Sequence, residues 1–409
     1  MLMKKDNIIR IRIFRLFLFF NLIYFLFSSF FWMVFLFPVN ILSACFSVLL
    51  ILSCLLSIRQ FQLSNQTLIL FFILILLSIW SLLSVGISYG VLTFFSYLSA
   101  ILLFILPVDV KHYVLNYVTK WFSIIMLISV CIFLITRIIT VPAPLGVFQI
   151  DELRYDPFNN YILFIESQSI FNTLIYRFNG PFLEPGHLAV VCALIITANK
   201  YEFKKNKWLW ILLLSIILSL SLAGYVILFL GYLLFKVKSY RLLLLSGIAV
   251  GGFLVFTIYI WNDGDNPVNA LIFSRLEYDE EKGVAGNNRT SEQTDVYFQK
   301  NLENGNLWIG LGSQEQDAFI AGAGYKIFFL RYGIIAAILV ACFYYNLIPR
   351  HANIRYSLAF LFLIVVIFIQ RAYPSWYSWL LAFTLGCGTT VKRSRCYRIN
   401  GVSHRNICD

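Results

Sequence analysis

Charge is scarce in this chain. Only 13% of its 409 residues are Asp, Glu, Lys or Arg, whereas 60% are apolar and the mean hydropathy is +0.80. Soluble domains carry about a quarter charged residues, so this composition excludes an ordinary water-soluble globular protein. Apolar runs recur along the sequence and approach the ~20 residues that a helix needs to cross a bilayer. We therefore predict an all-α polytopic membrane protein, with residues 1–409 forming a single integral membrane domain.

Familiar chemical signatures are also missing. None of the eight cysteines lies in a long polar segment, which excludes an external disulfide framework, and none has the spacing of a zinc site. The sequence contains no P-loop, no H-E-x-x-H motif and no dinucleotide-binding glycine pattern. Asp263-Gly-Asp265 spells a D-x-D, but its central glycine just after a helix end favours a turn over a metal site. We expect neither a metal nor a cofactor.

The apolar runs predict about twelve spans, near residues 17–37, 41–58, 67–85, 90–107, 121–141, 186–198, 208–222, 224–235, 241–260, 324–347, 355–370 and 376–390. Lys and Arg prefer the cytoplasmic side of a membrane. Alternating sides along the spans places every basic cluster on that side, with both termini cytoplasmic. The net charge of +12 then reflects topology and not nucleic-acid binding. Residues 208–235 form either two short spans that turn at 219–224 or a re-entrant hairpin, and both alternatives keep this orientation.

Two large loops, 142–185 and 261–322, face outward in this topology and hold most of the polar chemistry. Within the first loop, residues 161–178 are mostly apolar and aromatic. We expect that segment to lie along the membrane interface as an amphipathic helix. The first loop ends in the sequence Arg177-Phe-Asn-Gly-Pro-Phe-Leu-Glu184-Pro-Gly-His187.

Three side chains of this sequence can carry chemistry. Arg177 presents a planar fork of donors that suits phosphate oxygens, although an arginine beside a span also anchors in lipid headgroups. Glu184, at the mouth of the sixth span, suits proton transfer, or else it pairs with Arg177 or caps the helix start. His187 is the only histidine placed outside by the predicted topology. It is either a proton shuttle or a structural residue at the helix start.

The second loop and the later spans add further basic residues. Arg275 and Arg289 would clamp a pyrophosphate together with the first-loop arginine, unless they are merely solvated. Lys326, Arg331 and Arg371 lie within or at the outer ends of spans, where charges are costly and tend to face a polar cavity. Snorkelling to the interface is the alternative, and it is easier for Lys326 than for Arg331.

These motifs resemble the Wzy-type O-antigen polymerases, within the O-antigen ligase and polymerase superfamily of GT-C-like membrane glycosyltransferases. The matching positions are Arg177, Gly180, Glu184 and Pro185 before the sixth span, the Arg289 segment, Gly310-Leu-Gly312, and Gly324-Tyr325 with Tyr332-Gly333. The resemblance implies a metal-independent enzyme that polymerises undecaprenyl-pyrophosphate-linked oligosaccharide repeat units into O-antigen polysaccharide. It places this reaction on the periplasmic face of the bacterial inner membrane. Membrane lipid and a separate chain-length regulator are the other expected partners.

The resemblance also assigns substrate-binding roles. Arg177 and Arg289 would bind the donor pyrophosphate, with Arg275 assisting. Arg331 and Tyr325 are expected as further substrate contacts. Developing negative charge on the pyrophosphate would be stabilised electrostatically by these arginines.

The catalytic base is left open among Glu184, His187 and Asp317. Ligase-like members of the superfamily carry a histidine three residues before the tyrosine that matches Tyr325, and here that position is Gly322. This departure favours a polymerase over an O-antigen ligase. A lipid-linked oligosaccharide flippase is the alternative from another class. A transporter would be expected to show internal symmetry and charges spread through its helices.

Overall fold

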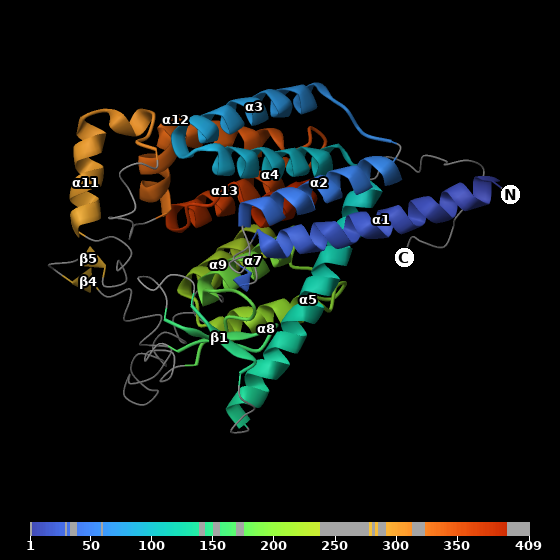
Figure 1. Cartoon of the computed structure of the whole chain (residues 1–409), viewed down its shortest axis with the longest axis horizontal. Helices are drawn as coiled ribbons and strands as arrows, with labels where there is room; N and C mark the ends of the chain where they lie inside the picture. The colour runs from blue at the N-terminus through green and yellow to red at the C-terminus, as the bar shows by residue number, and fades with distance from the viewer. Residues whose placement is uncertain are drawn as a thin grey trace.

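The structure is a computed structural model, which describes residues 2–28, 31–32, 39–58, 60–138, 144–149, 156–168, 176–237, 278–279, 283–284, 292–312 and 324–390. Most of these residues are helical. The helices are α1 (Leu2–Phe27), α2 (Val39–Ser57), α3 (Asn65–Val85), α4 (Ile87–Ile105), α5 (Val108–Ile138), α7 (Pro185–Ala198), α8 (Leu209–Ser219), α9 (Leu222–Lys236), α11 (Glu292–Glu303), α12 (Gly324–Asn346), α13 (Ile354–Gln370) and α14 (Tyr377–Gly388). Figure 1 shows most of them in a layered bundle, with α5 crossing it obliquely and α11 standing across one end.

Among the described residues, four helices are long and apolar enough to cross a membrane, judged by length and composition. They are α3, α4, most of α5 (Val108–Arg137) and α12. Shorter apolar helices accompany them, including α7, α8, α9 and α13. Side chains on the outside of this bundle are largely apolar; in α3, for example, Leu68 is 70% and Leu83 is 79% exposed. These features suit a protein embedded in a membrane through several helices.

The helix positions follow the predicted apolar runs closely, with two differences. α1 begins at Leu2 and ends at Phe27, whereas the run near 17–37 suggested a later helix. α5 begins at Val108 and not near 121, because its first turns hold Asp109, Lys111 and His112 and are still helical. Hydropathy detects only the apolar part of a helix, so polar turns at a helix end escape it. The predicted span at 241–260 lies outside the described residues.

The 208–235 segment forms a hairpin of two helices, α8 and α9. They are separated by Leu220, in the left-handed conformation at φ 47°, and Ser221 caps the start of α9. Aromatic contacts bring the far ends of both helices to one loop: Phe203 packs on Trp210 at the start of α8, and Tyr201 packs on Phe235 at the end of α9. The chain therefore returns to the side from which it left. With 11 and 15 residues, each helix falls short of the ~20 that a full span needs.

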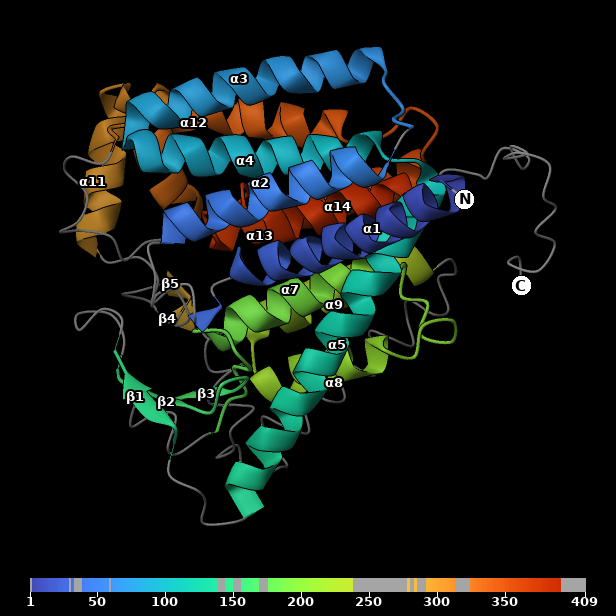
Figure 2. The ribbon, with the colours of Figure 1, turned by 45° about the vertical axis from the view of Figure 1, so that its right-hand side comes forward.

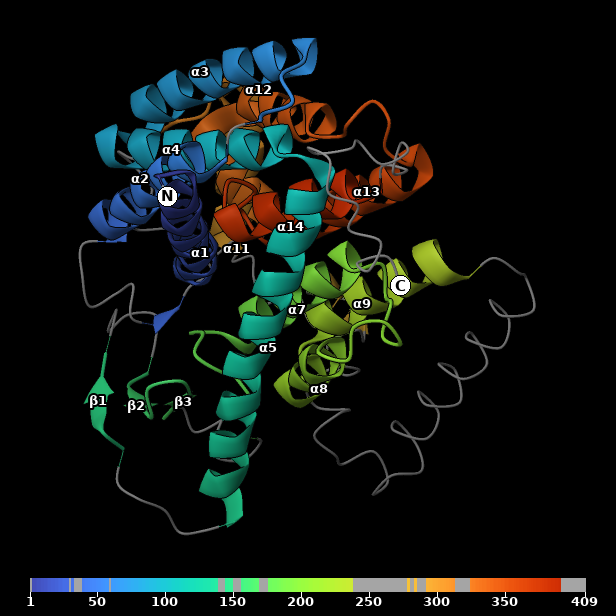
Figure 3. The same cartoon turned by 90° about the vertical axis from the view of Figure 1, so that its right-hand side faces the viewer.

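Two helices, α7 and α14, form the centre of the molecule. Every residue of α7 from Gly186 to Ala198 is buried, and so is every residue of α14. A helix that is apolar all round belongs inside a bundle. α7 packs between α14 on one side and the α8–α9 hairpin on the other (Figures 2 and 3). The start of α7 is the Glu184-Pro185-Gly186-His187 sequence, so that motif sits at the end of a buried helix.

A small antiparallel sheet replaces part of the expected interfacial helix. Its strands, in the order β1-β2-β3, are β1 (Gly146–Phe148), β2 (Phe158–Asn160) and β3 (Ile165–Ser167). The prediction of a helix from 161 is therefore wrong over the described part of that segment. Ile162, at φ 69°, donates its N–H to the Asn160 Oδ1 and forms the β2–β3 turn. An ion pair between Glu166 and Arg137, at the end of α5, holds the sheet to the bundle.

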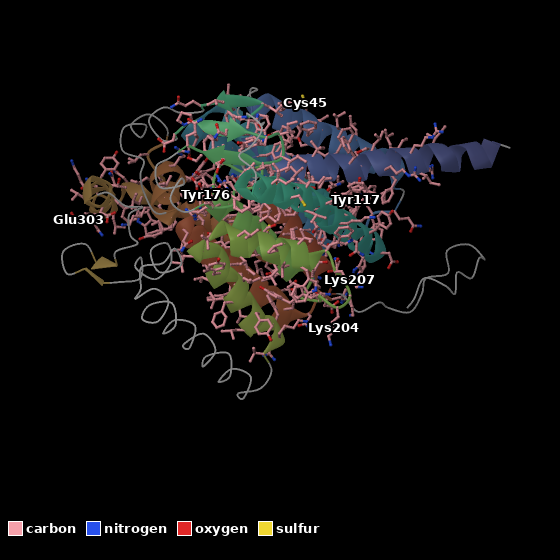
Figure 4. The ribbon with its side chains drawn as sticks, turned by 90° about the horizontal axis from the view of Figure 1, so that it is seen from below. Cys45, Tyr117, Tyr176, Lys204, Lys207 and Glu303 are labelled. Carbon is pink, nitrogen blue, oxygen red and sulfur yellow. The ribbon has the colours of Figure 1, made fainter. Side chains whose placement is uncertain are left out.

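A second, two-stranded sheet is short. It pairs β4 (Tyr278–Asp279) with β5 (Gly283–Val284) in antiparallel register. One further helical turn, a 3-10 helix at Asn306–Trp308, follows α11. Figure 4 shows Lys204 and Lys207 towards the part of the molecule where α1 and α5 begin, whereas Glu303 lies at the opposite end.

Gly333 breaks α12 with φ 84° and ψ 169°. Donors from outside the helix reach the three carbonyls before the break, namely Leu311 N to Leu330 at 2.7 Å, Gly312 N to Arg331 at 3.3 Å and Trp80 Nε1 to Tyr332 at 2.7 Å. Such donors are needed because unpaired backbone groups are costly away from water. Gly310 lies so close that a Cβ on it would be 2.6 Å from the Gly333 nitrogen. The Gly310-Leu-Gly312 and Gly333 motifs thus meet as one packed helix break.

Candidate functional site

Arg371 brings the two candidate bases of the first loop together. Its Nη1 lies 2.6 Å from the Glu184 Oε2 and 2.5 Å from the His187 Nε2. The same Glu184 oxygen lies 3.4 Å from the His187 Nε2. One nitrogen of the guanidinium therefore faces a carboxylate and an imidazole at once. Glu184 and His187 are three residues apart in the sequence, whereas Arg371 comes 184 residues after His187.

Local sequence explains how Glu184 and His187 come to share one direction. Glu184 is the N-cap of α7 and Pro185 occupies its first turn, where its missing N–H costs nothing. His187 lies three residues after the cap, so its side chain is on the same side of the first turn as Glu184. Arg371 follows the last residue of α13 and caps that helix through its backbone N–H to Ile367. Each side chain thus leaves the end of a helix.

Two glycines make room for Arg371. A Cβ on Gly186 would overlap the Arg371 Nη2, and a Cβ on Gly324 would overlap the Arg371 backbone. Gly186 belongs to the first-loop motif, and Gly324 opens α12. Arg371 therefore lies between glycines from two motifs that are far apart in the sequence, and a side chain at either position would collide with it.

The cluster is unequally exposed. The side chains of Arg371 and His187 are 6% and 4% exposed, whereas Glu184 is 31% exposed. Glu184 is thus the group of the three that an incoming molecule can reach. Trp376 covers the imidazole at a ring-centroid distance of 5.1 Å, and Tyr373 stacks on Trp376 at 4.4 Å. Within the described part of the chain, the Arg371 Nε has no hydrogen-bond partner.

Arg177 lies at the neighbouring helix turn. Its Nε donates to the Ser219 carbonyl at 3.3 Å and its Nη2 donates to the Leu220 carbonyl at 3.2 Å. Ser221 follows in the same turn, and its Oγ lies within 3.6 Å of a Cβ built on Gly186. Arg177 and Arg371 therefore flank one turn, the α8–α9 corner next to the start of α7.

Helix ends of both signs meet in this region. The N-terminus of α7 carries Glu184, the N-terminus of α9 is beside Gly186, and the N-terminus of α12 lies against Arg371. α14 begins just after the 371–376 segment. A helix N-terminus carries about half a positive charge and binds anions. The C-termini of α8 and α13 end in the same region, at Ser219 and Gln370, and each carries about half a negative charge. Together with the Glu184 carboxylate they offset much of the positive charge of the N-termini, so the two arginines, Arg177 and Arg371, are the groups here that favour an anion.

The later span residues occupy different surroundings. Lys326 pairs with Asp295 of α11 at 2.6 Å. Tyr325 packs edge-on against Phe298, in a small apolar cluster under α11. Arg331 is half-buried, two residues before the break in α12.

Three predicted site residues, Arg275, Arg289 and Asp317, lie outside the described residues. Among those that are described, the structure unites Glu184, His187 and Arg371, with Arg177 at the adjoining turn. The sequence predicted Arg371 only as a charge that faces a polar cavity at the end of a span. Its place at the start of the short Arg371-Ala-Tyr-Pro-Ser-Trp376 connection, where a charge is unusual, was the signal that could have marked it as a site residue. Tyr373 and Trp376 were not foreseen, because single aromatic residues are common in such a composition.

No group of three or more His, Cys, Asp or Glu suited to a metal ion occurs among the described residues. An open cavity of about 470 Å³ lies at the α3–α4 corner, lined by Trp80, residues 82–86 and residues 309–312. It is bounded by the segment that packs into the α12 break and by none of the charged residues above. Comparison of the chain with protein-family models, with curated proteins and with solved structures found no match.

Proposed function

We propose that this protein is a membrane glycosyltransferase that polymerises undecaprenyl-pyrophosphate-linked oligosaccharide repeat units into O-antigen polysaccharide. The observation that supports this most is the buried Arg371 beside the accessible Glu184, with Arg177 at the adjoining helix turn. A transferase with a pyrophosphate leaving group needs a positive site for that group and a nearby base. Arg177, at the α8–α9 turn, and Glu184, at the start of α7, are our candidates for these two roles.

In the proposed reaction, a sugar hydroxyl of the acceptor repeat attacks the anomeric carbon of the donor sugar. A new carbon–oxygen bond forms, and the bond from that carbon to the pyrophosphate breaks. The pyrophosphate leaves with the electron pair, still attached to its lipid. The hydroxyl proton passes to a base at the site, so atoms and charge balance.

The arginines act on the leaving group. Negative charge grows on the pyrophosphate as the bond breaks, and preoriented donors stabilise that charge without reorganising. Arg177 is half-exposed at the α8–α9 corner, and we propose that it binds the pyrophosphate there. Arg289 and Arg275 of the second loop would complete the clamp.

The proposed location follows from the same chemistry. The site lies at the start of α7, and Lys204 and Lys207 follow the other end of that helix. We take the basic clusters to mark the cytoplasmic side. The start of α7 would then face the periplasm, with the bacterial inner membrane around the bundle and both chain termini in the cytoplasm. Lipid-linked donors reach such a site by lateral diffusion, and the growing chain would require a length regulator as a separate partner.

A lipopolysaccharide gel of the native host tests this function. The gene is deleted and then restored on a plasmid. A ladder that collapses to core plus one repeat unit on deletion, and returns on complementation, is the result expected for a polymerase. Loss of even the single repeat would indicate a ligase or a flippase instead. An unchanged ladder would refute a role in O-antigen synthesis.

A further inference from the structure

We infer that Arg371 is a positioning residue that assigns the acid–base roles at this site: it leaves Glu184 as the base and holds His187 as a neutral hydrogen-bond acceptor. The base assignment rests on the proposed function. The hydrogen-bond assignment rests on geometry alone. Together they distinguish between the two first-loop candidates.

The direction of the Arg371–His187 hydrogen bond follows from the chemistry of arginine. A guanidinium has N–H donors and no acceptor. At 2.5 Å from the Arg371 Nη1, the His187 Nε2 must therefore accept. A nitrogen that accepts carries a lone pair and no proton, so the imidazole is neutral and its single proton is on Nδ1. Protonation of Nε2 would place two donors and two positive charges against each other in a buried site.

Glu184 is held differently by the same nitrogen. Its Oε2 accepts from Nη1 at 2.6 Å, the short distance of a charge-assisted bond. An arginine at this distance favours the ionised carboxylate, which is the form that accepts a proton. Glu184 also has an exposed fraction of 31%, against 4% for His187, so a substrate hydroxyl can reach it. A base must lie within hydrogen-bond reach of the proton that it removes.

His187 then supports the site without exchanging protons. Trp376 packs on its ring, and Gly186 confines the other terminal nitrogen of Arg371. With the ring fixed on one side and the glycine on the other, the guanidinium can present Nη1 to Glu184 in a single orientation. His187 therefore acts on Arg371, and Arg371 acts on Glu184.

The tautomer of His187 tests the first half of this inference without any activity assay. The full-length protein, labelled with nitrogen-15 at its four histidines, is reconstituted in nanodiscs, and H187Q identifies the His187 signals by their loss. We expect a protonated Nδ1 and an unprotonated Nε2 in the unsubstituted protein. A protonated Nε2, or a doubly protonated ring, would overturn the assignment. No Arg371 variant has to fold for this result.

Substitution of Arg371 provides the matched comparison. R371M removes the donors but keeps a long side chain, and we expect His187 to lose its single tautomer. R371K retains a charged donor, and we expect it to restore the tautomer in part. An unaltered His187 spectrum in a folded R371M protein would show that Arg371 does not position the ring.

Kinetics with a lipid-pyrophosphate-linked repeat unit test the second half. We expect E184Q to lower kcat by about a hundredfold or more, the usual contribution of a general base. H187Q, whose amide oxygen can still accept from Arg371, should lose less than tenfold, mainly in KM. A loss of kcat in H187Q as large as that in E184Q would make His187 the base. An unsubstituted protein that is inactive would refute the proposed function, while the nitrogen signals would still decide the role of Arg371.

Discussion

Gly186→Ala perturbs the candidate site without removing any functional group. The added Cβ would overlap the Arg371 Nη2, and the guanidinium must retreat by about 1 Å to reach ordinary contact distance. The Nη1 to Glu184 Oε2 distance is 2.6 Å, and an added 1 Å would take it beyond hydrogen-bond range. The substitution therefore tests whether the position of the charged groups matters, because all of them are still present.

The expected magnitudes differ for stability and for activity. Weakening one charge-assisted hydrogen bond costs about 1–3 kcal/mol, whereas alanine in a helical turn gains about 0.5–1 kcal/mol over glycine. The net loss in the free energy of unfolding should be no more than about 2.5 kcal/mol. A misplacement of about 1 Å in a catalytic group can cost about a hundredfold in rate. Activity should thus fall much further than stability.

Two measurements on the same variant would check this. Thermal unfolding in detergent gives the stability change, and polymer length on a lipopolysaccharide gel of the complemented host gives activity. Gly146→Ala is the matched control, because a Cβ there meets nothing within 4 Å, and it should leave both unchanged. Full-length polymer from Gly186→Ala would refute the claim that the placement of Arg371 matters.

Four further substitutions have defined outcomes. G333A should lower the unfolding free energy by about 1–3 kcal/mol in a denaturation assay, because φ 84° strains any residue with a Cβ. W80F removes the donor to the carbonyl before that break and should cost about 1–3 kcal/mol in the same assay. Arg177→Ala should shorten the polymer while R177K restores it in part, and full-length polymer from the alanine variant would exclude a phosphate contact there. Burial lowers the pKa of Lys200 below its ordinary 10.5. Between the lowered pKa and 10.5 the folded state binds fewer protons than the unfolded state, so stability should rise with pH in that window. K200M should remove this rise.

Most helix positions could be predicted from the sequence, because a long apolar run indicates a helix that is buried in lipid or in protein. The turn at Ser219–Ser221 was also anticipated, because a single helix between the two flanking basic clusters would have placed one cluster on the outer side. What hydropathy could not show is which apolar helices are central. α7 and α14 read like any other apolar run, yet they are buried on every side.

About half of the candidate site could be predicted from the sequence. Glu184 and His187 stood out because polar groups are rare in this chain and these are three residues apart. Arg371 could not be joined to them from the sequence, because the contact spans 184 positions and depends on where the residue after α13 lies relative to the start of α7. The short sheet was missed for a related reason, since the apolar residues of 158–167 suit a buried strand as well as a helix.

The most direct test of the account uses purified protein in lipid, supplied with an undecaprenyl-pyrophosphate-linked repeat unit. We expect a ladder of products that grows by one repeat at a time, with undecaprenyl pyrophosphate released at each step, and we expect E184Q to produce none of it. Absence of elongation by the unsubstituted protein, or an equal ladder from E184Q, would contradict a glycosyltransferase built around Glu184 and Arg371.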